Sequence, residues 1–326
     1  MKFKIDNIGY YLPKKVENIQ TLKKENPKWD VEKIIEKTGI NKRFISKKNE
    51  STTSMALEAV NNIKNFSSKK NEIDFLLFVT QTPEYVLPTS ACILQNKLGL
   101  QISSMCFDIN LGCSGFIYAL AISGSLINSS ICKKGLIICS EKYSSYIDKD
   151  NRTCRPVFSD GAAAVIVGKD ERDNIGPFDI GTDGSGYDKL IVTKQNFFDS
   201  ENKIKFKKNK IHMNGADVFT FTLSKVPLSI KNLLKKAEKN IEDIDLFIFH
   251  QASKFVLDKL AKNLNIPKNR IFINYNEIGN SVSATIPIAL YEAKKRHILK
   301  NNSLILLSGF GVGYSWGSCL VRWNDI

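Results

Sequence analysis

Continuous apolar runs that begin after polar residues recur along this chain and predict buried strands. One such run lies within residues 72–81 (EIDFLLFVTQ), and residues 243–251 (DIDLFIFHQ) repeat its pattern. Because polar residues do not alternate with the apolar ones, both faces of each strand are expected to be covered, as in a layered α/β fold. The alternating segment at residues 1–6 predicts a further strand at the N-terminus.

The similarity between the two runs continues downstream and indicates an internal duplication. Each run is followed by a glycine-marked turn, Gly112-Cys113-Ser114 in the first case and Gly279-Asn280-Ser281 in the second. Each turn leads into a predicted helix and then another apolar strand, at residues 116–127 and 135–140 and again at 284–293 and 303–308. A long period that occurs twice is typical of a duplicated domain. Turn residues at 168–176 mark the junction, so we expect one half at 1–170 and the other at 171–326.

Cys113 lies between a predicted strand at 105–109 and the predicted helix at 116–127. The helix dipole and the free N–H groups at such a position stabilise a thiolate, and the neighbouring Gly112 and Gly115 let a substrate come close. The position therefore suits the nucleophile of an acyl-transfer enzyme. A buried structural cysteine beside a glycine turn would give the same local pattern.

His250 and Asn280 lie at the corresponding places of the second half. His250 ends a predicted strand, where active sites of α/β folds collect, and Asn280 stands at a turn into a helix. Taken alone, a core histidine and a helix N-cap explain them equally simply. Duplication brings corresponding strand ends together, however, and Cys113 with two hydrogen-bonding groups is the set that acyl transfer requires.

Composition and cysteine usage restrict the class of protein. The chain has 326 residues, of which 43% are hydrophobic and 25% charged, which is typical of a globular protein. Seven cysteines, an odd number and mostly within apolar runs, indicate reduced thiols and a cytoplasmic location. The three histidines and the lack of a C-x-x-C pair argue against a zinc site. The N-terminal segment has no signal-peptide pattern. No apolar run approaches the ~20 residues that a membrane span needs.

The formal net charge of +14 raises the question of nucleic acid. The lysines are scattered, and no basic stripe interleaved with aromatic residues accompanies them, so we expect no nucleic-acid binding. A basic surface also attracts acidic partners, such as a carrier protein or a phosphorylated cofactor.

Seven motifs in order resemble the β-ketoacyl-[acyl-carrier-protein] synthase III family of thiolase-fold condensing enzymes. They are KTGI at 37–40, DINLGCSGF at 108–116, FSDGA at 158–162, MNGADVF at 213–219, FHQAS at 249–253, GNS at 279–281 and the glycine-rich segment SGFGVGYSWG at 308–317. The resemblance runs from the N-terminal strand to Trp323, which is nearly the whole chain.

The resemblance implies a duplicated, five-layered α-β-α-β-α thiolase fold that forms a homodimer. It implies a catalytic triad of Cys113, His250 and Asn280 and an oxyanion hole made by the backbone N–H groups of Cys113 and Val312. In such enzymes the cysteine takes an acyl group from a coenzyme A thioester. Malonyl-acyl carrier protein then loses carbon dioxide, and the resulting carbanion attacks the acyl-cysteine. No permanently bound cofactor or metal is implied.

The resemblance also implies a substrate channel shaped by Phe219 and Phe310, and a Leu87 that reaches across the dimer to limit acyl length. Arg152 matches an arginine that stacks on the adenine of coenzyme A, but Lys33 occupies the place of the tryptophan on the other side of the adenine. Lys37 replaces an arginine that contacts the phosphates of coenzyme A and keeps its charge. These departures make an acyl group delivered on a carrier protein more plausible.

Two further lysines, Lys254 and Lys262, follow His250 on a predicted helix and suit an acidic carrier protein, although a solvated helix face explains them equally well. Ser159 replaces a glycine that is common in the family.

Two other functions use the same residues. An acyltransferase would pass the cysteine-bound acyl group to a hydroxyl or an amine, and a degenerate thiolase-fold protein would only bind a carrier protein. A pair of donors that stabilises an enolate is required only by condensation, so the sequence favours condensation.

Overall fold

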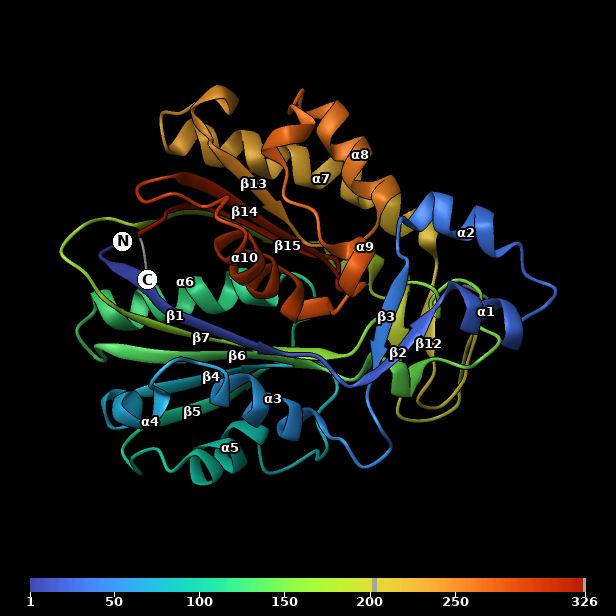
Figure 1. Cartoon of the computed structure of the whole chain (residues 1–326), viewed down its shortest axis with the longest axis horizontal. Coiled ribbons are helices and arrows are strands. Elements are labelled where there is room, and N and C mark those ends of the chain that lie inside the picture. The colour runs from blue at the N-terminus through green and yellow to red at the C-terminus, as the bar shows by residue number, and fades with distance from the viewer. Residues whose placement is uncertain (201–203, 325–326) are drawn as a thin grey trace.

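The computed structural model describes residues 1–200 and 204–324, which form five layers in the order α-β-α-β-α (Figure 1). The first sheet has the strand order β1-β7-β6-β4-β5, and the second has the order β13-β14-β15-β8. The first sheet contains β1 (Phe3–Tyr11), β4 (Phe75–Val79), β5 (Met105–Ile109), β6 (Lys134–Glu141) and β7 (Gly161–Lys169). The second contains β8 (Ile175–Thr182), β13 (Leu246–Phe249), β14 (Leu304–Gly311) and β15 (Ser315–Arg322). The predicted fold class is therefore confirmed.

Helices cover both sheets on their outer faces and separate them in the middle. Between the sheets lie α6 (Gly115–Asn128) and α10 (Thr285–Lys295), which contact strands of both. The outer face of the first sheet carries α3 (Thr52–Asn61) and α5 (Ser90–Leu98), and that of the second carries α7 (Gly215–Lys236) and α8 (Lys254–Asn263). Among residues 1–200 and 204–324, no helix is both long and apolar enough to cross a membrane.

The strand pairing shows the duplication directly. In the first sheet β4 is parallel to β6, which is followed by antiparallel β7 and β1. In the second sheet β13 is parallel to β14, which is followed by antiparallel β15 and β8. The chain leaves the first sheet after Lys169 and enters the second at Ile175, so the boundary expected at residues 170 and 171 falls in the connecting segment.

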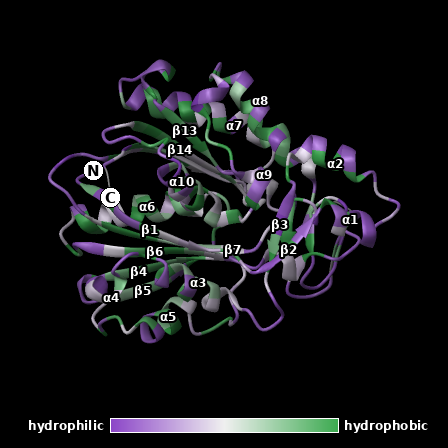
Figure 2. Cartoon of the chain, viewed as in Figure 1, coloured by the Kyte–Doolittle hydropathy of each residue, from purple (hydrophilic) through white to green (hydrophobic). Residues whose placement is uncertain are grey.

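The continuous apolar runs are explained by burial on both faces. In β4 the side chains of Phe75, Leu77 and Val79 pack into the central layer, whereas Leu76 and Phe78 pack beneath the outer helices, and all are fully buried. Apolar residues accordingly concentrate in the sheets and in the central helices, while polar residues cover the outside (Figure 2). The strands predicted from the two runs are thus confirmed, with their ends shortened by polar flanking residues.

Two segments of the chain lie outside the layered core, beside the edge at which the parallel strands end (Figure 1). The first comprises β2 (Lys15–Asn18), α1 (Ile19–Glu25), α2 (Val31–Thr38) and β3 (Lys42–Ile45), and its β3 contacts the short helix α9 (Tyr275–Ile278). The second comprises the short strands β9 (Leu190–Val192), β10 (Phe197–Asp199), β11 (Ile204–Phe206) and β12 (Ile211–Met213). The short helix α4 (Phe66–Lys69) precedes β4.

The tight packing between β6 and β4 gives a stability prediction. A Cβ atom on Gly135 would lie 2.0 Å from Cζ of Phe75, its partner in the neighbouring strand. We expect Gly135→Ala to lower the free energy of unfolding by about 1–3 kcal/mol, because an overpacked core must shift its side chains or backbone. Urea denaturation followed by circular dichroism measures the change. Gly184→Ala is the control, since a Cβ there would meet nothing within 4 Å; equal stability of the two variants would contradict the prediction.

Candidate active site

Cys113, His250 and Asn280 line one cavity of about 440 Å³. Cys113 lies between the end of β5 and the first turn of α6, and His250 immediately follows β13. Asn280 lies between α9 and the 3-10 turn at Val282–Ala284. The structure therefore brings together the three residues that the duplication was expected to place at corresponding strand ends.

The backbone of β14 comes unusually close to Cys113. A Cβ atom on Gly311 would lie 3.0 Å from the Cys113 Sγ, and one on Gly309 would lie 2.6 Å from the Cys113 carbonyl oxygen. These two glycines therefore allow an approach that any larger residue would obstruct. Most of the glycine-rich segment 308–317 forms the paired ends of β14 and β15, and residues 312–314 form the turn between them.

Burial controls the protonation of the Cys113 thiol. Cys113 is only 6% exposed, and its burial raises the pKa of the thiol well above the ordinary value; the charge of Glu141 acts in the same direction, and the backbone N–H of Cys113 opposes it. The expected stabilisation of a thiolate at the helix N-terminus is therefore wrong for the free protein, because desolvation of a buried anion outweighs the helix dipole. The nucleophile rests as a thiol.

His250 is a neutral imidazole in the same apolar surroundings. Burial lowers the pKa of His250 to about 3. Its Nδ1 lies 2.7 Å from Thr285 Oγ1, and the Thr285 hydroxyl donates to the Val282 carbonyl oxygen at 2.9 Å. With that hydroxyl proton engaged, Thr285 accepts from Nδ1–H, which leaves the lone pair on Nε2. Rotation of the hydroxyl toward Nδ1 gives the opposite tautomer, in which Nε2 carries the proton.

The two polar atoms of the Asn280 side chain have different contacts, one in the local turn and one with His250 at the cavity. Its Oδ1 accepts a hydrogen bond from the Val282 N–H at 2.9 Å, while its Nδ2 lies 3.3 Å from His250 Nε2. The capping and the catalytic interpretations are thus compatible. Val282 has a φ of +55°, a left-handed conformation that is strained for a β-branched residue and that aims its N–H at the amide of Asn280.

Two backbone donors remain available at the cavity. In the part of the chain that the structure describes, the N–H groups of Cys113 and Val312 donate to no other residue. Val312 lines the cavity from the turn that joins β14 and β15. Both groups can therefore donate to an oxygen of a bound substrate.

The expected channel residues divide into two groups. Phe310 and Phe219 line the cavity; the Phe310 ring meets that of His250 edge-on at 5.6 Å, and the Phe219 ring stacks on Phe255. Leu87 is 79% exposed and is not among the residues that line this cavity.

The expected contacts for coenzyme A or a carrier protein lie at the surface. Lys37 is exposed and lines the cavity on the side of α2, whereas Arg152 is exposed but is not part of the lining. Lys254 and Lys262 are exposed on α8, as predicted for that helix, and Lys254 pairs with Asp258 at 2.5 Å.

Two lining residues, Tyr143 and Leu190, had no signal in the sequence. Both also line a neighbouring cavity of about 960 Å³, so they form part of a wall between the two spaces. The Tyr143 hydroxyl donates to Gln81 Oε1 at 2.6 Å, and its ring packs on that of Phe158 at 5.2 Å. Only the fold brings Tyr143, which follows β6, and Leu190, which begins β9, to the same place.

Glu141 is a third residue that the sequence did not indicate. It is fully buried and accepts hydrogen bonds from the Gln81 N–H and from the hydroxyl groups of Thr82 and Ser283, and burial raises its pKa to about 8. Ser283 belongs to the turn after Asn280, so this carboxyl group connects the two halves of the fold beside the cavity.

Metal and disulfide sites are not found in the described residues. No group of three or more His, Cys, Asp or Glu side chains there could hold a metal ion. All seven cysteines lie within that part and have free thiols.

The burial of Cys113 predicts its reactivity. We expect alkylation of Cys113 by iodoacetamide to accelerate with pH from about pH 6 to about pH 10 without reaching a plateau, because the thiolate is the reactive form and its pKa is raised. Peptide mapping by mass spectrometry measures the rate for Cys113, with exposed Cys92 as the internal comparison. A plateau below neutral pH would show that the thiol is instead acidified.

Two family models match separate parts of the chain. The model described as "3-Oxoacyl-[acyl-carrier-protein (ACP)] synthase III" matches residues 107–184, and the model of its C-terminal part matches residues 234–323. Curated proteins named beta-ketoacyl-[acyl-carrier-protein] synthase III are similar over almost the full length. The protein of Fusobacterium nucleatum is 35% identical over 98% of this chain and 98% of its own. That of Clostridium novyi is 36% identical over 98% of this chain and 99% of its own.

Solved structures of proteins with this name have the same fold. The 3-oxoacyl-[acyl-carrier-protein] synthase III of Aquifex aeolicus is 35% identical, with a TM-score of 0.88 over 98% of this chain and 100% of its own. The enzyme of Thermus thermophilus is 29% identical, with a TM-score of 0.92 over 99% of this chain and 100% of its own. The chain therefore belongs to the 3-oxoacyl-[acyl-carrier-protein] synthase III family.

Proposed function

We propose that this protein loads an acyl group onto Cys113 from an acyl thioester and condenses it with malonyl-acyl carrier protein to give a β-ketoacyl product. The observation that carries the proposal is the pair formed by His250 and Asn280, whose Nε2 and Nδ2 atoms lie 3.3 Å apart on the cavity that Cys113 also lines. Two donors at one point can stabilise the enolate oxygen that decarboxylation creates. Acyl transfer to a hydroxyl or an amine would not use such a pair.

The first half-reaction acylates Cys113. Its Sγ attacks the thioester carbonyl carbon, while the thiol proton passes to the lone pair on His250 Nε2. The backbone N–H groups of Cys113 and Val312 donate to the tetrahedral oxyanion. When the carbonyl re-forms, the carrier's thiolate leaves and takes the proton from Nε2, so the imidazole returns to its neutral form.

The second half-reaction uses the same imidazole as a donor. Rotation of the Thr285 hydroxyl favours the tautomer with the proton on Nε2, so that His250 and Asn280 both donate to the thioester oxygen of the malonyl group. Loss of carbon dioxide leaves an enolate, whose carbon attacks the acyl-cysteine carbonyl. The new carbon–carbon bond forms as the Cys113 thiolate leaves, and the thiolate then takes up a proton from water, which offsets the charge of the lost malonyl carboxylate.

The donor and partner proposals rest on surface position and charge. Lys37 at the cavity and the exposed Arg152 would contact phosphates of coenzyme A, and Lys254 and Lys262 would meet an acidic carrier protein. In a homodimer, Leu87 would enter the partner's substrate channel and limit acyl length.

An apolar surface supports the homodimer: Tyr85 is 58% exposed and Val86 78%. The two side chains also line the larger cavity, and Leu87 follows them in the chain. We propose no permanently bound cofactor and a cytoplasmic location, which the free thiols support.

We expect Cys113→Ala to abolish acyl-enzyme formation, because it removes the only atom that bonds to the acyl group. Intact-mass spectrometry after incubation with acyl-coenzyme A and acyl-carrier-protein donors of different lengths measures the mass shift. Cys154→Ala is the matched control, since that cysteine is buried in the same apolar cluster without lining the cavity. A mass shift that persists in Cys113→Ala would remove this residue from the mechanism.

We expect Asn280→Ala and His250→Ala to reduce carbon dioxide release from malonyl-acyl carrier protein about 10²–10³-fold, because each removes one donor to the enolate oxygen. Self-acylation should fall less in Asn280→Ala, since the backbone oxyanion hole and the His250 proton acceptor both remain, whereas His250→Ala should slow both half-reactions because it also removes that acceptor. Release of labelled carbon dioxide and the rate of the acyl mass shift measure the two half-reactions, with His297→Ala at an exposed position as the control. Equal losses of the two half-reactions in Asn280→Ala would contradict the enolate role.

A further inference from the structure

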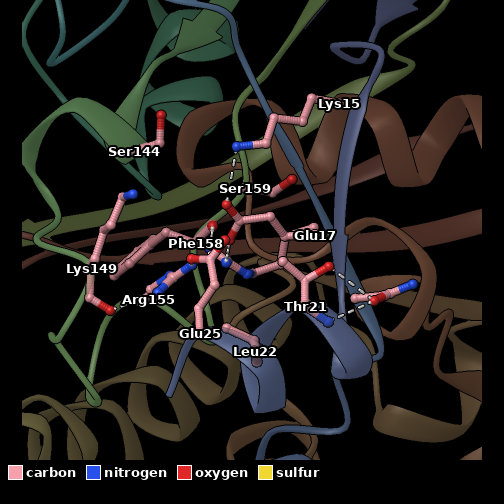
Figure 3. Close-up of polar contacts among 12 residues, drawn as sticks. Lys15, Glu17, Thr21, Leu22, Glu25, Ser144, Lys149, Arg155, Phe158 and Ser159 are labelled. Atoms are coloured by element: carbon pink, nitrogen blue, oxygen red, sulfur yellow. Dashed lines mark hydrogen bonds and ion pairs between the residues drawn. The ribbon is translucent and has the colours of Figure 1, made fainter. Parts of the chain in front are cut away.

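A cluster of four charged side chains, three of them buried, lies close to the segment that pairs with Asn280. Glu17 of β2, Glu25 of α1 and Arg155 lie together beside Phe158 (Figure 3). Arg43 of β3 completes the cluster, with its Nη2 2.5 Å from Glu17 Oε2, while Arg155 Nη2 lies 3.4 Å from the same oxygen and 2.5 Å from Glu25 Oε2. Glu17, Arg43 and Arg155 are buried, at 7%, 2% and 5% exposure.

Arg43 connects this cluster to the segment that holds Asn280. Its Nη1 donates to the Phe158 carbonyl oxygen at 2.9 Å. The residues on either side of Phe158 hold the backbone of Asn280: the Asn280 N–H donates to the Val157 carbonyl at 3.0 Å, and the Ser159 N–H donates to the Asn280 carbonyl at 2.9 Å. One guanidinium therefore fixes the carbonyl between the two hydrogen bonds that set the position of Asn280.

The side chain of Arg43 also packs directly against that loop. A Cβ atom on Gly279 would lie 3.2 Å from Arg43 Cγ, so the alkyl part of the arginine supports the residue before Asn280. Arg155 has a different target, because its Nη1 donates to the Lys149 carbonyl at 2.7 Å. The cluster thus has two parts: Arg43 contacts the segment that pairs with Asn280, whereas Arg155, with Glu25, contacts the segment at Lys149.

Stability alone explains this arrangement poorly. Apolar side chains of similar volume often stabilise a core as well as a buried ion pair does. In addition, Arg43 Nε is buried without a hydrogen-bond partner among the described residues, which carries a free-energy cost. What an arginine provides here is geometry, since its planar fork joins a carboxylate and a carbonyl in fixed directions.

We infer that Arg43 is a positioning residue for the decarboxylation step: Glu17 orients its guanidinium, which holds the Phe158 carbonyl and, through it, the backbone of Asn280. The inference rests on the proposed function. Displacing Asn280 moves its Nδ2 away from the enolate oxygen. The backbone donors of Cys113 and Val312, which serve acylation, belong to other segments.

The test compares Arg43→Lys with Glu25→Gln, measured by carbon dioxide release from malonyl-acyl carrier protein and by self-acylation. Lysine keeps the charge beside Glu17 but cannot bond the carboxylate and the carbonyl in one plane. We expect Arg43→Lys to reduce carbon dioxide release about 10- to 100-fold and self-acylation less than about threefold, because small displacements at a reaction centre have large effects on rate. Glu25→Gln changes only the contact with Arg155 and should leave both rates unchanged.

Glu17→Gln is the second variant, for the case that Arg43→Lys does not fold, which thermal unfolding reports. It keeps an acceptor for Arg43 Nη2 without the charge, and we expect a smaller loss, again confined to carbon dioxide release. Equal effects on the two half-reactions, or no effect on either, in the folded variants would overturn the inference alone. A wild-type protein that acylates but releases no carbon dioxide would overturn the proposed function and this inference together.

Discussion

Two main-chain hydrogen bonds to Asn280 join the halves of the duplicated chain at the reaction centre. Both come from the segment Val157–Ser159 of the first half, whereas His250 is held within its own half by the Ser308 carbonyl. The relative position of the two side chains therefore depends on how the halves meet. The pairing itself involves only main-chain atoms. Arg43, which is oriented by Glu17, supports it by donating to the Phe158 carbonyl.

Desolvation has the same effect on three buried titratable groups at or beside the cavity. Burial favours the neutral forms of the Cys113 thiol, the His250 imidazole and the Glu141 carboxyl. The buried end of the site thus rests in its neutral forms, and negative charge arises there as substrate bonds change. Donors already fixed in such a medium stabilise that charge more than water would, because they need not reorient.

Periodicity in the sequence predicted a layered, duplicated α/β fold and the convergence of Cys113, His250 and Asn280, because a duplication determines which strand ends correspond. The five-layered arrangement was implied by the family resemblance alone. Periodicity could not indicate how deeply Cys113 is buried. That burial outweighs the effect of the helix N-terminus on the pKa of the thiol. Within the segment 308–317, Gly309 and Gly311 lie in a strand and allow the close approach to Cys113, a role that only the structure reveals. Tyr143, Leu190 and the pairing of Glu17 with Arg43 depend on tertiary contacts that no local pattern encodes.

Val312 contributes two independent things at one position. Its main chain offers a donor to the reaction centre, while its side chain lines both the smaller and the larger cavity. Every amino acid except proline supplies the same N–H group, so the donor survives almost any replacement, whereas the wall changes with each one. Replacements at this position would therefore alter the shape of both cavities while keeping the N–H group that we propose for the oxyanion hole.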